Sequence, residues 1–324
     1  MTSLNHREKI FVTGGAGFIG SNLADRLLGE GHRVVIFDNF STGQEKFLKE
    51  AGRSPSFTLV RGDLLDYDLV AKAMSGCHFV YHLAANADVR FGLEHPRKDL
   101  DNNTVATYHV LEAMRANTIK RIAFASTGAI YGDSAVIPTP EDTPFPIQTS
   151  LYGASKLAAE GMIQAYCEGF DFQSWIFRFA GILGERYTHG HVFDFYKQLL
   201  DDPAKLHVLG DGAQRKSYIY VQDCINAIFM AVEKASEKVN IFNLGVDGYC
   251  TVNDSIRWIT QALGLSPKIT YAGGARGWVG DNPFIFLDTK RIRSLGWQPT
   301  LTIEEGIART LRYHQANAWV LERR

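Results

Sequence analysis

The sequence has few cysteines and no long hydrophobic run. Its four cysteines, Cys77, Cys167, Cys224 and Cys250, are scattered through 324 residues without the paired spacing of a zinc or redox site. We therefore expect reduced thiols, a cytoplasmic protein and no metal site. No apolar run reaches the roughly 18–20 residues that cross a bilayer. The polar stretch at residues 1–9 is unlike a secretory signal, so we expect no membrane association.

The sequence also lacks an excess of charge of either sign. There are 34 lysines and arginines against 35 aspartates and glutamates, a formal net charge of −1. Nucleic acids and anionic membranes select basic surfaces, so neither is an expected partner. The composition is 45% hydrophobic and 12% aromatic, which is enough to bury a sizeable core in one large domain or two joined ones.

Short apolar runs alternate with helical patterns through the first half of the chain. The expected strands are residues 9–12, 33–38, 57–61, 79–83, 121–125 and 174–179. The expected helices are residues 18–29, 67–75, 100–116 and 152–167. This alternation predicts an α/β protein whose parallel sheet is covered by helices on both faces. The second half is less regular, and its segment 181–208, with three histidines and several aromatics, has the character of an insertion that encloses a ligand.

A glycine-rich turn lies between the first strand and the first helix. Gly14-Gly15-Ala16-Gly17-Phe18-Ile19-Gly20 permits a tight turn that brings backbone N–H groups to a pyrophosphate at the positive end of the helix. Glycines in tight turns are commonly structural, but Asp38 ends the next strand, where a carboxylate accepts hydrogen bonds from an adenosine ribose and repels a 2′-phosphate. The pattern predicts NAD rather than NADP.

The turn fixes the expected domain organisation. We predict a Rossmann-type doubly wound parallel sheet, the NAD-binding domain, in residues 1–178, with later returns near 217–248. Residues 179–324 are expected to form mainly a smaller mixed α/β domain that binds substrate.

A tyrosine and a lysine share one face of the helix at 152–167. Tyr152 and Lys156 are four positions apart, at i and i+4, so their side chains lie on the same side of the helix. A phenol titrates near pH 10, too high for a base at neutral pH, and a nearby ammonium with a cationic nicotinamide would favour the phenolate. Ser126 and Thr127 directly follow the expected strand 121–125, where a hydroxyl serves either as a plain cap or as a contact to a substrate hydroxyl.

Together these residues resemble the extended short-chain dehydrogenase/reductase family, in its NAD-dependent nucleotide-sugar epimerase/dehydratase branch and nearest to the UDP-glucose 4-epimerases within it. The matching motifs run in family order across nearly the whole chain. They are TGGAGFIGS (13–21), DNFSTG (38–43), GDL (62–64), YHLAA (81–85), Asn103, STGAIYG (126–132), YGASK (152–156), GDG (210–212), YIYVQD (218–223) and LGW (295–297).

The resemblance implies residue roles. Tyr152 would be the catalytic acid/base, Lys156 would lower its pKa and hold the nicotinamide ribose, and Thr127 would contact the sugar 4-hydroxyl. The implied NAD contacts are Gly14, Gly17, Phe18, Ile19 and Gly20 at the pyrophosphate, Asp38, Asn39, Ser41, Thr42 and Gly43 at the adenosine ribose, Asp63 and Leu64 at the adenine, and Leu83, Ala84, Ala85, Asn103, Ser126, Tyr152, Lys156 and Phe179 along the rest of the cofactor. The implied substrate contacts are Thr127, Gly181, His191, Val192, Arg215, Lys216, Tyr218, Arg276 and Asp281.

Departures from the family pattern help to choose the reaction. Related 4,6-dehydratases carry an Asp–Glu pair directly after the threonine, and related decarboxylases keep the Glu. Here these positions are Gly128 and Ala129, which cannot transfer protons. The resemblance therefore implies inversion at C4 of a nucleotide-diphosphate sugar through a transient 4-keto sugar. The substrate that the family resemblance implies is a UDP-hexose. Gly181 replaces a common asparagine, and Lys216-Ser217 replaces a usual Arg-Asp.

Two other functions remain open on the sequence. A dehydratase or reductase of the same family would release a 4-keto product or consume added NAD(P)H. A non-catalytic NAD-binding sensor would typically lack the tyrosine or the lysine, and both are kept. The family commonly forms homodimers through helices equivalent to 100–116 and 152–167, so a homodimer is expected.

Overall fold

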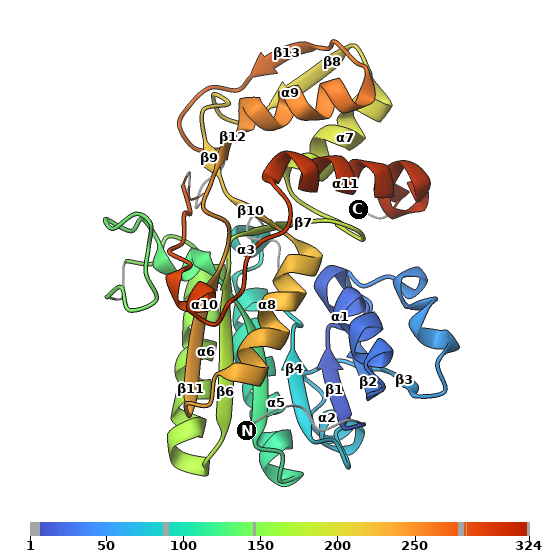
Figure 1. Ribbon diagram of the computed structural model, residues 1–324, viewed down its shortest axis with the longest axis vertical. Helices are drawn as coiled ribbons and strands as arrows, with labels where there is room; N and C mark the ends of the chain where they lie inside the picture. The colour runs from blue at the N-terminus through green and yellow to red at the C-terminus, as the bar shows by residue number, and fades with distance from the viewer. Residues whose placement is uncertain (1–6, 87–90, 145–146, 278–281, 283, 323–324) are drawn as a thin grey trace.

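A seven-stranded parallel sheet forms the centre of the computed structural model, which describes residues 7–86, 91–144, 147–277, 282 and 284–322 (Figure 1). The strand order is β3-β2-β1-β4-β5-β6-β11, and every neighbouring pair is parallel. The strands are β1 (Lys9–Thr13), β2 (Arg33–Asp38), β3 (Phe57–Arg61), β4 (Phe79–His82), β5 (Arg121–Thr127), β6 (Gln173–Phe179) and β11 (Val239–Leu244). This order confirms the predicted doubly wound sheet and places its reversal between β1 and β4.

Helices cover both faces of the sheet. On one face lie α1 (Phe18–Gly29) and α8 (Val221–Lys234), and on the other lie α2 (Tyr67–Ala73), α5 (Ala106–Ala116) and α6 (Leu151–Phe170). Consecutive β1 side chains alternate between the two cores, which explains why the central strands are apolar throughout rather than at every second residue.

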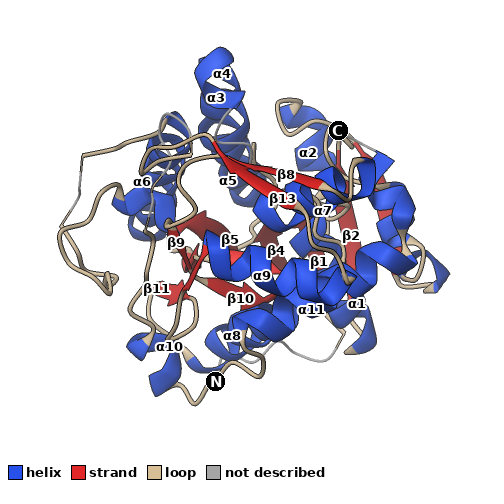
Figure 2. Cartoon of the chain, turned by 90° about the horizontal axis from the view of Figure 1, so that it is seen from above, coloured by secondary structure: helices blue, strands red, loops and turns tan. Residues whose placement is uncertain are grey.

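A second region stands at the end of the sheet from which β6 leads into β7 (Gly181–Leu183) (Figure 1). Its other elements are α7 (His191–Asp201), β8 (Lys205–Val208), β9 (Arg215–Lys216), β10 (Tyr218–Tyr220), β12 (Cys250–Thr251), α9 (Val252–Leu263), β13 (Lys268–Tyr271) and α11 (Ile303–Ala316). Figure 2 shows β8 and β13 side by side, as their parallel pairing requires. The short helix α10 (Lys290–Ser294) lies beside β11 instead, where Arg291 donates to the Ile241 carbonyl at 3.3 Å (Figure 1).

Two details differ from the expected elements. The chain re-enters the large sheet with β11, whereas β10 pairs with β7 in a separate two-stranded sheet. The helical segment expected at 100–116 begins earlier, with α4 (Pro96–Asp99), because proline suits the first turn of a helix. It then passes through a π-helical stretch, Leu100–Val105, before α5. The remaining short elements are α3 (Phe91–Glu94) and the 3₁₀ turns Glu45–Leu48, Ala51–Arg53, Gly128–Tyr131 and Ala318–Glu322.

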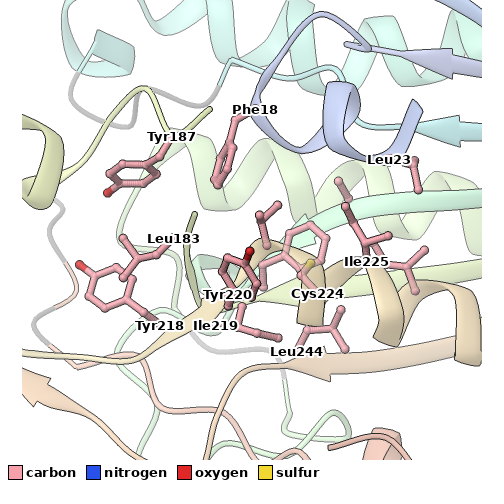
Figure 3. Packing of buried hydrophobic residues seen from close by; sticks show 14 of the residues in the cluster. Phe18, Leu23, Leu183, Tyr187, Tyr218, Ile219, Tyr220, Cys224, Ile225 and Leu244 are labelled. Carbon is pink, nitrogen blue, oxygen red and sulfur yellow. The ribbon is translucent and has the colours of Figure 1, made fainter. Parts of the chain in front are cut away.

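Aromatic side chains join the sheet to the second region. Phe18, the first residue of α1, meets Tyr187 edge-to-face with ring centroids 5.6 Å apart. Figure 3 shows this pair beside Tyr218, Tyr220 and Leu183, which belong to the same buried cluster. The start of α1 therefore packs directly against the second region. In the described part of the chain, none of the helices is both long and apolar enough to span a membrane.

A buried aspartate on α8 anchors the segment that leads into α11. Asp223 accepts hydrogen bonds from the backbone N–H of Thr300 (2.9 Å) and from its hydroxyl (2.7 Å). Trp297, also buried, donates its indole N–H to the backbone oxygen of Asp223 at 2.9 Å.

Replacing this carboxylate should destabilise the fold. Asp223→Ala removes a buried, charged acceptor that receives two hydrogen bonds from Thr300, so we expect a loss of about 2 to 3 kcal/mol in the free energy of unfolding. Urea denaturation measures it. Asp201→Ala, at the exposed end of α7, is the matched control and should change stability by less than about 0.5 kcal/mol. Equal effects of the two variants would contradict the anchoring role.

Candidate active site

The glycine-rich turn is tight enough to exclude side chains at two positions. Gly14 has φ of +65°, and its N–H donates to the Phe37 carbonyl at 2.9 Å. A Cβ on Gly14 would lie 2.8 Å from the Cα of Ala84, and one on Gly20 would lie 2.2 Å from the Gly14 carbonyl oxygen. These contacts bring the turn directly against the residues that follow β4.

The start of α1 is suited to an anion. Gly17 is its N-cap and supplies no side-chain cap, and the first turn carries no acidic residue. The N–H groups of the first turn have no helical partner, and the helix dipole adds partial positive charge there. A pyrophosphate is the ligand that this arrangement favours.

Asp38 ties the end of β2 to the turn. Its carboxylate is buried and accepts hydrogen bonds from Ala16 N–H (2.9 Å) and Phe40 N–H (2.8 Å). Burial raises the pKa of this carboxyl above its usual range, although the two N–H bonds oppose the shift. Nearby, Asn39 donates to Asp63 at 3.0 Å, so the tips of β2 and β3 are joined by side chains.

A cavity of about 290 Å³ lies beside these residues, at the ends of β1 to β4. The expected NAD contacts among its lining residues are Gly14, Asp38, Asn39, Ser41, Thr42, Asp63, Leu64, Ala84 and Ala85. It is also lined by residues that the sequence analysis missed, namely Phe37, Gly62, Asn86, Lys98, Asn102 and Ala106. Of these, Asn86 lies in the loop after β4, and Lys98, Asn102 and Ala106 lie in the helical segment from α4 to the start of α5, where no motif included them.

A buried histidine fixes the end of β4. His82 lies between the hydroxyls of Thr13 (2.7 Å from Nδ1) and Thr107 (3.0 Å from Nε2). Thr107 donates its own proton to the Asn103 carbonyl at 2.6 Å, so His82 donates from Nε2 and accepts at Nδ1. Burial lowers the pKa of His82 to about 3 and keeps it neutral. The Thr13 oxygen then receives the N–H groups of Leu83 (3.1 Å) and Ala84 (3.2 Å).

Asn103 connects the cofactor side to α6. It is buried in the π-helical stretch, donates to the Ser155 hydroxyl at 2.9 Å and accepts from Asn86 N–H at 2.9 Å. Ser155 in turn donates to the Tyr152 carbonyl at 2.9 Å. One amide side chain therefore holds both the loop after β4 and the first turn of α6.

Tyr152 and Thr127 meet at the end of β5. Burial raises the pKa of the Tyr152 phenol to about 12, and a hydrogen bond with Thr127 acts in the opposite direction. Thr127 Oγ1 also accepts from Ala129 N–H at 3.1 Å, which caps the 3₁₀ turn. The Ser150 hydroxyl caps α6 by accepting from Gly153 N–H at 3.0 Å, and this fixes the helix start beside Tyr152.

Lys156 lies one helical turn further along α6. Its side chain is buried, donates to the Ala125 carbonyl at 2.7 Å and lies 4.5 Å from the centroid of the Phe124 ring. Burial lowers the pKa of its ammonium to about 7, while Glu160 acts to raise it. Ser126, which the resemblance implies as a cofactor contact, is buried and donates a hydrogen bond to the Glu160 carboxylate.

The position after Thr127 has little room. A Cβ on Gly128 would lie 2.7 Å from Cγ2 of Ile285 and 3.2 Å from the carbonyl oxygen of Phe179. An acidic side chain there would require Ile285 to move.

The expected substrate residues fall into two groups. In the first, the Tyr218 hydroxyl lies 2.5 Å from His191 Nδ1, and a Cβ on Gly181 would lie 2.4 Å from the Tyr218 ring. Val192 is completely buried, so its side chain faces the core.

The second group is basic. The Arg215 guanidinium lies over Phe284, 3.7 Å from the ring centroid, and Lys216 donates to the Asn282 carbonyl at 3.0 Å. Arg276 pairs with Asp133 at 2.7 Å. Asp281 lies outside the described residues.

The site as a whole fits a dinucleotide. The cavity lies at the ends of β1 to β4, Asp38 and Gly14 both line it, and Gly14 belongs to the turn that leads into the uncapped start of α1. Beyond β4, Tyr152 and Lys156 reach the end of β5.

Comparisons with known proteins agree with this arrangement. Residues 10–245 match the model of the NAD dependent epimerase/dehydratase family. The UDP-glucose 4-epimerase of Mycolicibacterium smegmatis is 32% identical over 94% of this chain and 98% of its own length. UDP-glucuronic acid decarboxylase 1 of Xenopus tropicalis is 30% identical over 96% of this chain and 74% of its own length. A crystal structure of UDP-galactose 4-epimerase is 37% identical, with a TM-score of 0.86 over 96% of this chain and 100% of that one.

The fold and the site define a class of enzymes that bind a dinucleotide at the carboxyl ends of the strands of a parallel sheet. The chain belongs to the NAD-dependent epimerase/dehydratase family, which acts on nucleotide sugars, and NAD is its cofactor.

Two glycine-to-alanine replacements in α1 should have opposite effects on stability. Gly20→Ala places a methyl group against the Gly14 carbonyl, so we expect a loss of about 1 to 3 kcal/mol. A Cβ on Gly29 meets nothing within 4 Å, so Gly29→Ala should stabilise the same helix by about 0.5 kcal/mol. Urea unfolding of the NAD-free protein measures both. A tolerated Gly20→Ala would show that the turn is not sterically closed.

Proposed function

We propose that the protein inverts C4 of a nucleotide-diphosphate sugar, a UDP-hexose, through a transient 4-keto sugar. One observation at the end of β5 carries this proposal. Tyr152 forms a hydrogen bond with Thr127, and the two residues after Thr127 are Gly128 and Ala129. One acid/base is present, and the two positions that follow the threonine carry no proton-transfer group.

In this mechanism the chain's own residues move one proton and hold the sugar. Tyr152 takes the proton of the 4-hydroxyl and later returns it, while Thr127 accepts or donates a hydrogen bond to the same oxygen. NAD, when bound, supplies a reversible hydride acceptor next to C4. Lys156 would hold the nicotinamide ribose and place its charge beside the phenol.

The titration of the pair explains why the two side chains need each other. Burial raises the pKa of Tyr152 to about 12 and lowers that of Lys156 to about 7, so it disfavours a phenolate and an ammonium alike when each is alone. Opposite charges formed side by side in a site of low polarity stabilise one another. A cationic nicotinamide would act in the same direction on the phenol.

The substrate would lie mainly against residues 179–324. Arg215, Lys216 and Arg276 offer positive charge for a diphosphate, and the start of α7 offers the backbone at His191 and Val192.

We further propose a cytoplasmic homodimer. The described cysteines are all buried and unpaired, which suits a reducing compartment, and α5 and α6 expose Tyr108 and Phe170 on the helices through which related enzymes dimerise.

Dehydration or decarboxylation is the main alternative, since a decarboxylase is among the relatives. A dehydratase would need acid/base groups at positions 128 and 129, where Ile285 restricts any side chain on Gly128. A sensor without activity would have no use for the retained Tyr152 and Lys156.

Purified protein should interconvert C4 epimers without added cofactor. Proton NMR and mass spectrometry would follow UDP-glucose, UDP-galactose, their N-acetylamino forms and the uronic acids. We expect a new anomeric signal at unchanged mass for at least one pair. A product lighter by one water or by carbon dioxide would overturn the proposal in favour of dehydration or decarboxylation. No turnover with NAD bound would overturn the UDP-hexose assignment.

Removing the phenol hydroxyl should abolish most of the turnover. Tyr152→Phe loses the acid/base, so we expect kcat to fall by about 100- to 10,000-fold while UDP-sugar binding changes little. Tyr108→Phe, on the exposed surface of α5, is the matched control. Kinetics on the accepted sugar and calorimetric binding measure the two effects. Full activity of Tyr152→Phe would rule out the mechanism.

A further inference from the structure

Glu160 extends the functional face of α6 by one more turn. It follows Tyr152 and Lys156 at the same four-residue spacing, and it is completely buried. The Arg178 guanidinium donates to both carboxylate oxygens, from Nε to Oε1 at 3.1 Å and from Nη2 to Oε2 at 2.8 Å. Ser126 donates to Oε1 as well.

These donors come from directly paired strand residues. Ser126 on β5 is the register partner of Arg178 on β6, and the next pair is Thr127 with Phe179. The Glu160 carboxylate therefore fastens α6 to both strands one residue before Thr127. The two elements that carry these three residues, α6 with Tyr152 and Lys156 and β5 with Thr127, meet at this one group, and β6 joins them there.

Arg178 is held on its other side too. Its Nη1 donates to the Tyr131 hydroxyl at 2.6 Å and to the Glu141 carbonyl at 2.8 Å. Tyr131 in turn donates to Asn243 on β11 at 2.9 Å. The guanidinium is thus fixed in place and remains charged, because Glu160 and Tyr131 raise its pKa more than burial lowers it.

A buried ion pair of this kind is poorly explained by stability alone. The cost of removing two charges from water commonly equals what their attraction returns, and apolar residues of similar volume often stabilise a fold as well or better. The ionisable groups next to the Glu160–Arg178 pair, above all Lys156, point to a chemical role for it.

Few ionisable groups act on the Tyr152–Lys156 couple in the part of the chain that the structure describes. Glu160 on α6 acts on Lys156, and Asp99 on α4 acts on Tyr152. His82 on β4 faces Lys156 but is neutral, with a pKa lowered to about 3.

Behind Glu160 stand the remaining groups of the cluster. They are Arg178 on β6, Tyr131 in the 3₁₀ turn and Glu141 in the loop after it. Burial raises the pKa values of Tyr131, to about 12, and of Glu141.

We propose that Arg178 and Glu160 are positioning residues that form a charge-balanced clamp: Glu160 locks the end of β5 against α6, and Arg178 neutralises it so that the charge of Lys156 remains available to the phenol of Tyr152. The proposal rests on the acid/base role of Tyr152 in the proposed function. Without Arg178, the clamp would carry a net negative charge that opposes the phenolate. Without Glu160, it would carry a net positive charge that favours it.

The test is the sign of the change in phenol ionisation in two single variants. Arg178→Met should raise the pKa of Tyr152, Glu160→Gln should lower it, and the double variant should return it toward the original value. Glu160 lies about 12 Å along the helix axis from Tyr152, and one charge at that distance should change the phenolate-to-phenol ratio at a given pH roughly tenfold.

The readout is phenolate absorbance of the NAD-loaded protein against pH. The chain has 13 tyrosines, so each variant is measured as a difference from the same variant carrying Tyr152→Phe. The pH profile of kcat on the accepted sugar should move with the absorbance. Arg178→Lys keeps the charge but not the two-pronged contact, so it should keep the titration close to the original while lowering stability.

The opposite signs separate the clamp from a merely structural pair. Shifts of both single variants in the same direction, or no shift in either, would overturn the proposal, whatever happens to stability. Should Arg178→Met not fold, the shift in Glu160→Gln and its reversal in the double variant decide the matter. Because absorbance needs no turnover, opposite shifts without epimerisation would refute the proposed reaction and leave the clamp standing.

Discussion

The close approach of the glycine-rich turn to the end of β4 is the constraint on which the site depends. Gly14 has no room for a Cβ against Ala84, and the position of Ala84 is set by Thr13, whose hydroxyl receives its N–H. Thr13 is in turn oriented by the neutral His82. This chain of contacts fixes where α1 begins. Phe18, the first residue of α1, packs against Tyr187 and so links the start of the helix to the second region (Figure 3). The cofactor side and the substrate side are thus placed by one buried network.

Burial acts on the site in two opposite ways. It keeps His82 uncharged, so that a hydrogen-bond network rather than a charge holds the end of β4. At Tyr152 and Lys156 it disfavours each charged form alone, which makes the two ionisations depend on each other and on the cofactor. The same low polarity makes a lone carboxylate at Glu160 costly and gives its pairing with Arg178 a consequence beyond packing.

The sequence predicted the parts of the molecule that local chemistry determines. The glycine turn, Asp38 and the Tyr152–Lys156 spacing each require particular residue types at fixed positions, and the strand–helix alternation gave the sheet. Glu160 and Arg178 were not predicted as site residues, because their partners come from other elements and only the folded sheet pairs Ser126 with Arg178. Lys98 and Asn102 line the cavity from a helical segment in which the sequence analysis singled out Asn103 alone. The pairing of β10 with β7 likewise depends on tertiary packing, since a three-residue strand carries too little pattern to choose its neighbour.

The reaction proposed for this chain is also restricted from a distance. Ile285 and Leu287 lie within 3.3 Å of the position that a Cβ on Gly128 would take, and Leu287 is packed with Ile130 and Tyr131 of the 3₁₀ turn. A dehydratase with an acidic side chain at position 128 would require the segment that carries Ile285 and Leu287 to move at the same time. A change of the reaction to dehydration would therefore require coordinated substitutions in two segments far apart in sequence, because the side chains of Ile285 and Leu287 already fill the space beside Gly128.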